Sequence, residues 1–187
     1  MNIKHLPLSE SLLAFAAWVQ ERASANDTFK VPRFVVGPSA YNFMLWHLCG
    51  VYDATGAVRK ELEAFIDACC PAQGLVAKEC LVCVAGPGQN GRPFQYNHFL
   101  PDAVRTHLVL TGAGTLQHRT AKIDYTAGDV FQVEPELFGS EMASSGLKHY
   151  STHVVVMWTD AGAGPIWEAY AHANAIRDAR LKSQEKR

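Results

Sequence analysis

Short apolar runs separated by glycine-containing turns characterise residues 106–135. Residues 108–110 are apolar, the pattern breaks at 112–114, and a further turn at 126–129 leads into the apolar run 130–133. Short strands with turn signals at roughly every ten residues predict a small all-β barrel or sandwich. We expect Gly112, Gly114 and Gly128 to lie where the backbone bends or adopts positive φ.

Apolar residues before this stretch recur at the spacing of helices. One set follows Ser9, which is placed to cap a helix, and a second set follows a turn at 53–56 and ends before Pro71. Residues 41–48 are apolar nearly all round, which predicts a buried helix. The two periodic sets are Leu8, Leu12, Phe15 and Val19, and Val58, Leu62, Phe65, Ile66 and Cys69.

These patterns divide the chain into three parts. Residues 1–74 form a helical N-terminal region, residues 75–160 form the β region, and residues 161–187 form a C-terminal helix and tail. Pro165 suits the first turn of that last helix. Its apolar face is formed by Ile166, Ala169, Tyr170, Ala173 and Ile176.

Composition and charge narrow the class of protein. With 187 residues, 48% of them hydrophobic, the chain can bury a substantial core as one domain with a helical extension. The net charge of -1 creates no overall field that would attract nucleic acid or an anionic membrane. The sequence contains no apolar run of membrane-spanning length and no signal-peptide layout at its start. We therefore expect a cytoplasmic protein with no membrane partner and no direct nucleic-acid partner.

The five cysteines read as reduced thiols, because their number is odd and no export signal accompanies them. Cys80 and Cys83 have the internal spacing of a zinc-binding pair. A structural zinc site needs four ligands, and a second pair at comparable spacing is missing. Burial as small core residues is the simpler interpretation of these two cysteines.

The β region resembles a cupin. The resemblance depends on a strand that enters the G-x-G at 110–114, on the A-G-D-V-F at 127–131, and on Pro135 one strand later. It covers roughly residues 78–160 and is closest to the sugar-binding domains of arabinose-regulator (AraC-type) proteins. It implies an α+β fold: a cupin-like small β-barrel with an N-terminal helical subdomain and a C-terminal helix.

The resemblance also implies where metal ligands would lie. Metal-binding cupins place two histidines one residue apart, a glutamate on the strand before the glycine turn, and a later histidine. The glutamate position falls on Arg105, and a cation there would repel a metal. We therefore expect no metal and no cofactor. The histidine positions fall on His98 and Leu100, or Phe99 and Pro101, and on Gly139 or Ser140.

Other histidines leave a rebuilt metal site open as an alternative. His107 is two residues beyond Arg105 and hence on the same strand face, while His118 and His153 belong to other predicted strands. A lone histidine is more often a hydrogen-bonded or exposed residue than a ligand. We therefore prefer an interpretation without metal.

Arg105 and His107 on one face predict a different kind of site. A guanidinium and an imidazole inside an apolar barrel suit a small anionic or oxygen-rich molecule. The competing interpretation is that Arg105 pairs with Glu134 or Asp102 at the barrel rim and binds nothing. The remaining side chains that we expect to line the same cavity are Tyr96, His98, His153 and Trp158.

Two functional hypotheses follow. The first is a non-enzymatic, cupin-like ligand-sensing or protein-interaction module, regulatory in role. AraC-type regulators carry a further DNA-binding domain, for which this sequence offers no counterpart. The alternative is a cupin-type enzyme: an isomerase or epimerase that uses His107, or a metal-dependent dioxygenase with a rearranged metal site. We also expect a homodimer, because the predicted helices offer much apolar surface.

Overall fold

The computed structural model describes residues 3–25, 52–53, 55–85, 93–95, 103–118, 121–134 and 141–160. After the short strand β1, the two described helices precede the remaining strands. The elements are β1 Ile3–His5, α1 Glu10–Ala25, α3 Ala57–Ala68, β2 Leu75–Ala85, β3 Pro93–Gln95, β4 Val104–Thr111, β5 Ala113–His118, β6 Ala121–Thr126, β7 Asp129–Val133, β8 Glu141–Ser145 and β9 Ser151–Asp160.

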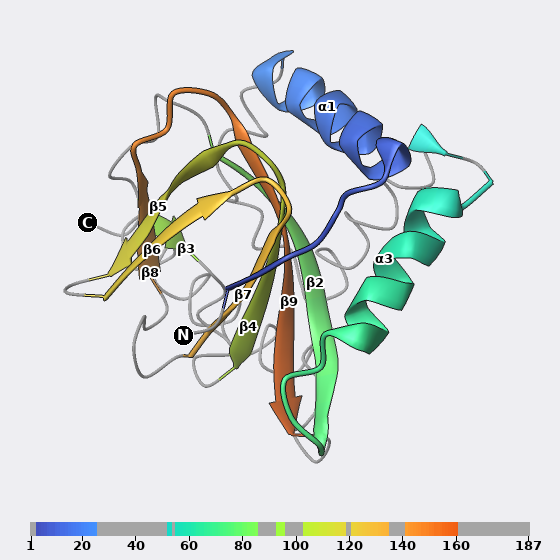
Figure 1. Ribbon diagram of the computed structural model, residues 1–187, viewed down its shortest axis with the longest axis vertical. Helices are drawn as coiled ribbons and strands as arrows, with labels where there is room; N and C mark the ends of the chain where they lie inside the picture. The colour runs from blue at the N-terminus through green and yellow to red at the C-terminus, as the bar shows by residue number, and fades with distance from the viewer. Residues whose placement is uncertain are drawn as a thin grey trace, which may run out of the picture.

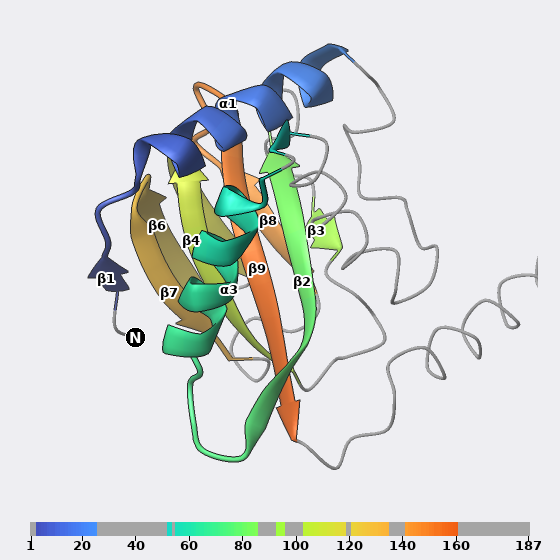
Figure 2. The same cartoon turned by 90° about the vertical axis from the view of Figure 1, so that its right-hand side faces the viewer.

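The strands form two antiparallel sheets. One has five strands in the order β1-β7-β4-β9-β2, and the other has four in the order β3-β8-β5-β6. Helices α1 and α3 cover one face of the five-stranded sheet, and the four-stranded sheet lies on its other side (Figure 1, Figure 2). The predicted combination of helices with antiparallel β structure is therefore confirmed.

Strands β4 and β9 form the centre of the larger sheet and are buried on both faces. Their register pairs Arg105 with Met157 and His107 with Val155, while Leu108 pairs with Val154. Because successive side chains on a strand point to opposite faces, odd-numbered residues share one face and even-numbered residues the other, up to the register shift that follows Val109. The even-numbered face packs beneath the helices, so the odd-numbered face lies on the side of the four-stranded sheet.

Helix α1 forms where the spacing of apolar residues predicts it. The Ser9 hydroxyl accepts a hydrogen bond from Leu12 N at 3.2 Å, as a helix cap does. Phe15 and Val19 are fully buried, and the helix contacts β4 and β9. Gln20 adds a polar contact, because its amide donates to the Thr152 hydroxyl at 3.0 Å. This helix is attached to the sheet by both apolar packing and hydrogen bonds.

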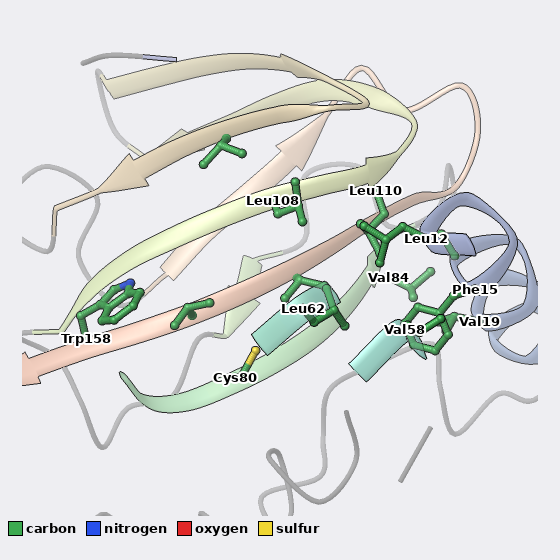
Figure 3. Close-up of a cluster of buried hydrophobic side chains, with 14 residues drawn as sticks. Leu12, Phe15, Val19, Val58, Leu62, Cys80, Val84, Leu108, Leu110 and Trp158 are labelled. Atoms are coloured by element: carbon green, nitrogen blue, oxygen red, sulfur yellow. The ribbon is translucent and has the colours of Figure 1, made fainter. Parts of the chain in front are cut away.

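Helix α3 confirms the second predicted helix. The Asp53 carboxylate accepts hydrogen bonds from Ala57 N at 2.8 Å and from Val58 N at 3.2 Å, which satisfies the exposed amides of the first turn. Val58 and Leu62 are buried in the same core as Phe15 and its neighbours from the sheet, shown in Figure 3. Burying a side chain of this size contributes about 1.5–3 kcal/mol. Both helices thus cover the sheet of their own chain. Their apolar faces are buried within the chain and no longer support the predicted homodimer.

Two of the predicted glycine positions do have positive φ. Gly112 has φ 84° and Gly128 has φ 89°. A Cβ atom on Gly112 would lie 2.7 Å from the Tyr150 carbonyl oxygen and 2.8 Å from Ser151 Cα. The turn between β4 and β5 therefore packs directly on the start of β9, and only glycine fits there without a shift of backbone.

Two strands were not predicted. β1 is exposed and pairs with β7, while β8 pairs with β3 and β5. Cys80 is buried in β2 and belongs to the core beneath the helices, as the core interpretation expects. No helix in the described part of the chain is long and apolar enough to cross a membrane. The predicted helices at 41–48 and 161–187 lie outside the described residues.

Candidate functional site

Arg105 and His107 share the face of β4 that points away from the helices. Both side chains are completely buried, with 0% exposure. On either side of Arg105 the register places an apolar residue, Val133 on β7 and Met157 on β9. A full positive charge therefore lies inside the protein between apolar neighbours, where the effective dielectric constant is lower than in water.

His153 joins this group from the neighbouring strand. It pairs in register with Val109 of β4, and its Nδ1 lies 3.3 Å from Nδ1 of His107. Its other ring nitrogen, Nε2, lies 2.8 Å from the Ser151 hydroxyl, which in turn donates to the Thr111 carbonyl oxygen at 3.1 Å. The two imidazoles and the serine form a continuous hydrogen-bonded chain inside the molecule.

Aromatic rings from both sheets enclose the histidines. The ring of His107 stacks on Phe131 of β7 with centroids 4.9 Å apart. Tyr125, on β6 of the four-stranded sheet, packs edge-on against His153 with centroids 4.6 Å apart. These rings fix the orientation of both imidazoles and keep water from them. The group formed by Arg105, His107, Ser151, His153, Tyr125 and Phe131 is called the inner cluster below.

Burial decides the charge state of the two histidines. It lowers the pKa of His153 from its ordinary value of 6.5 to about 3. The pKa of His107 is held well below 6.5, first by burial and then by the nearby His153 and Arg105. Both imidazoles are consequently neutral at physiological pH, and each has one N–H donor and one acceptor nitrogen.

The structure places the six predicted site residues in different surroundings. Arg105, His107 and His153 come together, as expected. Trp158 does not: it lies on the opposite face of β9, where its Nε1 donates to the Thr106 hydroxyl at 2.9 Å and its ring joins the core under the helices. The expectation that Trp158 lines the same cavity is wrong, because it lies five positions after His153 on one strand, and an odd separation puts the two side chains on opposite faces. Tyr96 and His98 lie outside the described residues.

The competing interpretation was that Arg105 pairs with Glu134 or Asp102 at the barrel rim, and Glu134 does not fit it. Arg105 is fully buried, whereas Glu134 is exposed just beyond the end of β7. The other suggested partner, Asp102, lies outside the described residues, as do the resemblance-derived ligand positions at 98–101 and 139–140. Arg105 is an interior residue.

A rebuilt metal site finds partial geometric support. His107 and His153 do approach each other, while the side chain of His118 is outside the described part. Within that part, no group of three or more histidine, cysteine, aspartate or glutamate side chains is arranged to hold a metal ion. The donor set that the structure describes is two neutral imidazoles beside a guanidinium, and the positive charge of Arg105 opposes a cation there.

Sequence reasoning missed three members of the inner cluster. Ser151 is two residues before His153 on one strand, so the two-residue period of a strand already placed them on one face. Tyr125 and Phe131 carried no comparable signal, because their contacts with the histidines depend on how the β6–β7 hairpin packs across the two sheets.

This arrangement can bind or polarise a small molecule. Arg105 offers N–H donors in a planar fork that matches carboxylate or phosphate oxygens. The neutral imidazoles supply one donor and one acceptor each, and Tyr125 supplies a hydroxyl. All are set in apolar and aromatic surroundings, the usual composition of a small-molecule site.

No protein-family model matches the chain, and no curated protein matches its sequence. Among solved structures, a cupin protein from Bacteroides fragilis is 17% identical, with 50% of this chain and 71% of that chain covered and a TM-score of 0.34. A Cupin 2 conserved barrel domain protein from Salinispora arenicola is 16% identical, with 56% and 80% covered and a TM-score of 0.35.

A DMSP lyase from Ruegeria pomeroyi is also similar, at 14% identity. The similarity covers 51% of this chain and 43% of the lyase, with a TM-score of 0.33. Cupin proteins are thus among the solved structures that this chain resembles over about half its length, and a similarity of this size says nothing of shared chemistry.

Proposed function

We propose that the inner cluster binds a small anionic or polar molecule, and that the chain is a non-enzymatic, cupin-like sensing module of the cytoplasm. The observation that carries this proposal is the complete burial of Arg105 on the same face as His107 and His153. Groups with strongly perturbed protonation gather at functional sites more often than elsewhere. We also propose that the sheets close into a barrel and that two copies of the chain form a homodimer.

Charge supports an anionic ligand. Moving a guanidinium out of water is costly, and a carboxylate or phosphate that binds it bidentately offsets that cost with charge-assisted hydrogen bonds.

The donor set supports binding without metal. Arg105 stands where the cupin resemblance implies a carboxylate ligand, so the position holds a cation instead of a metal-binding anion. A guanidinium also recognises an anion directly, which makes a bridging metal unnecessary for that class of ligand.

The test replaces Arg105 by methionine. This change keeps most of the stem volume and removes the charge and the N–H donors. A thermal-shift screen of carboxylates, phosphates, sugars and sugar acids selects the compound that most raises Tm, and calorimetry measures its affinity. We expect Arg105→Met to fold and to lose about 2 kcal/mol of binding free energy, or roughly thirtyfold in Kd.

The matched control is Arg59→Met, because Arg59 is an exposed arginine on α3 whose guanidinium bonds Glu63. That variant should bind with unchanged affinity. Undiminished affinity in Arg105→Met would refute the proposed site. The homodimer is tested separately by light scattering, and a mass equal to one chain at high micromolar concentration would contradict it.

The hydrogen-bonded chain from Ser151 through His153 to His107 supports acid–base chemistry as a second candidate, an isomerase or epimerase. Such an enzyme would exchange a carbon-bound hydrogen of the bound compound with solvent, so deuterium incorporation followed by NMR would favour it over sensing. A dioxygenase with a rearranged metal site would instead contain near-stoichiometric metal when purified without a histidine tag.

A further inference from the structure

Two adjacent cysteines, Cys69 and Cys70, lie where α3 ends and the chain turns into β2 (Figure 1). Cys69 follows the last residue of the helix, and its N–H donates to the Phe65 carbonyl oxygen at 3.0 Å and to the Ile66 carbonyl oxygen at 3.2 Å. Cys69 is half-buried against the core beneath the helices, whereas Cys70 is exposed. Both are free thiols, and neither belongs to the inner cluster.

Backbone carbonyl oxygens lie beside both sulfur atoms. The Cys69 thiol donates to the Ile66 carbonyl oxygen, with Sγ and oxygen 3.6 Å apart. The Cys70 Sγ lies 3.3 Å from the Ala72 carbonyl oxygen and 3.6 Å from that of Leu75. Carbonyl oxygens carry partial negative charge. The surroundings of both sulfurs therefore favour a positive charge over a negative one.

The end of α3 adds to this preference for a cation. The aligned peptide dipoles of a helix place a partial negative charge at its C-terminus, where a positive charge is favourable. The last turn of α3 carries Asp67 and no basic residue, so that turn does not supply the positive charge itself. Burial, then the Cys70 thiol and Asp67, raise the pKa of Cys69 to about 12. Cys69 thus remains a thiol until a cation takes the place of its proton.

Covalent geometry and ligand number narrow the kind of cation. Adjacent Cα atoms lie about 3.8 Å apart across a trans peptide, below the range of about 4.4–6.8 Å that disulfides usually span. A disulfide between the two cysteines would therefore be strained, whereas an ion held by both sulfurs needs no sulfur–sulfur bond. Zinc prefers four ligands, and the described part of the chain holds no group of three or more histidine, cysteine, aspartate or glutamate side chains placed for a metal. A soft ion that accepts two sulfur ligands fits the pair better.

We propose that Cys69 and Cys70 bind one soft monovalent cation, Cu(I), through both sulfur atoms. Thiolates are among the ligands that select Cu(I). Each S–H proton leaves to solvent as a copper–sulfur bond forms, and the oxidation state of copper does not change. Rotation about the two Cα–Cβ bonds brings the sulfurs to one ion. The site is separate from the inner cluster, so this inference is independent of the proposed function.

The first test is a competition for Cu(I) under anaerobic conditions. Fully reduced protein is titrated with the Cu(I) complex of bicinchoninate, whose colour reports the copper that the chelator retains. We expect the wild type to take up one Cu(I) per chain that the double variant Cys69→Ser, Cys70→Ser does not, because serine has no sulfur ligand. Each single variant should lose the same ion, since one sulfur ligand then remains. Cys80→Ala is the matched control: Cys80 is buried in β2, and its replacement should leave this uptake unchanged.

Two results of this competition would overturn the inference. One is copper uptake by the double variant equal to that of the wild type, and the other is uptake that needs only one of the two cysteines. Zn(II), measured in the same way against a zinc chelator, should show no difference between the wild type and the double variant. A loss of zinc in the double variant as large as the loss of copper would overturn the assignment to a soft monovalent ion.

The second test uses wild-type protein alone, so it does not depend on the folding of a variant. Phenylarsine oxide forms arsenic–sulfur bonds with two neighbouring thiols and releases one molecule of water. Native protein is treated with it, the remaining thiols are alkylated in denaturant, and a small dithiol removes the arsenical before peptide mapping. We expect Cys69 and Cys70 to be protected together, and prior loading with Cu(I) to prevent the reaction of the arsenical with them. Alkylation of either cysteine to the same extent as in untreated protein would overturn the pairing of the two thiols, on which the copper site depends.

Discussion

Gly112 is the position where one added methyl group should do the most damage to both the fold and the inner cluster. Its φ of 84° is in the left-handed region, which disfavours alanine by about 1–2 kcal/mol. The alanine Cβ would also lie 2.7 Å from the Tyr150 carbonyl oxygen, 2.8 Å from Ser151 Cα and 2.9 Å from Ser151 Cβ. None of these three atoms can rotate away, so the start of β9 has to move.

The expected cost is the sum of two terms. Forcing a methyl group into packed structure costs about 1–3 kcal/mol, which with the backbone term gives about 2–5 kcal/mol for Gly112→Ala. Gly146 is the matched control: its φ is 69° and nothing lies within 4 Å of an added Cβ. Gly146→Ala should therefore lose only the backbone term, about 1–2 kcal/mol.

Urea unfolding followed by circular dichroism measures both variants, and the midpoints are compared at equal m-values. Because Ser151 must shift, Gly112→Ala should also alter the NMR signals of His153, and Gly146→Ala should not. A cost for Gly112→Ala no greater than that for Gly146→Ala would refute the reasoning that the turn and the start of β9 are in contact.

Three further predictions concern the histidines, the core and the helix contact. Between about pH 6.5 and 3, His153 binds a proton in the unfolded chain but not in the folded protein. The free energy of unfolding should therefore fall as the pH falls, by up to about 1.4 kcal/mol per pH unit. His153→Gln should flatten this slope, and an unchanged slope would contradict the argument that burial lowers the pKa of His153. Leu62→Ala should lower the free energy of unfolding by about 2–5 kcal/mol, because Leu62 is fully buried. Leu13→Ala, at a position 41% exposed, should lower it by less than about 1 kcal/mol. Similar urea midpoints for the two variants would count against α3 as part of the core. Gln20→Leu removes the amide that donates a hydrogen bond to Thr152, and it should lower the free energy of unfolding by about 1–3 kcal/mol. A stability equal to that of the wild type would argue against this contact.

The sequence predicted best what depends on local spacing. The helical period located α1 and α3, and Ser9 was recognisable as a cap because a cap lies next to its helix. The two-residue period placed Arg105 and His107 on one face, since both belong to one uninterrupted strand. These inferences needed no knowledge of which strands pair.

The predictions from the sequence were wrong or incomplete where the pairing of distant strands decides which face a side chain occupies. Strand β9 is buried on both faces from Ser151 to Trp158, so it has no alternation of polar and apolar residues to show which face is interior. Its orientation follows from its register with β4, which no local pattern encodes. Trp158 was for that reason assigned to the wrong face. β1 has only three residues, all exposed, and therefore lacks the apolar signal that identifies a strand.

The burial of β9 on both faces also limits how this protein can change. One face of that strand carries His153 toward the inner cluster, and the other carries Trp158 and its apolar neighbours toward the helices. Inserting or deleting a single residue in mid-strand would exchange the two sets beyond that point, because side chains alternate with a period of two. Substitutions can therefore retune the inner cluster one position at a time, whereas a change in the length of β9 would disrupt core and site together.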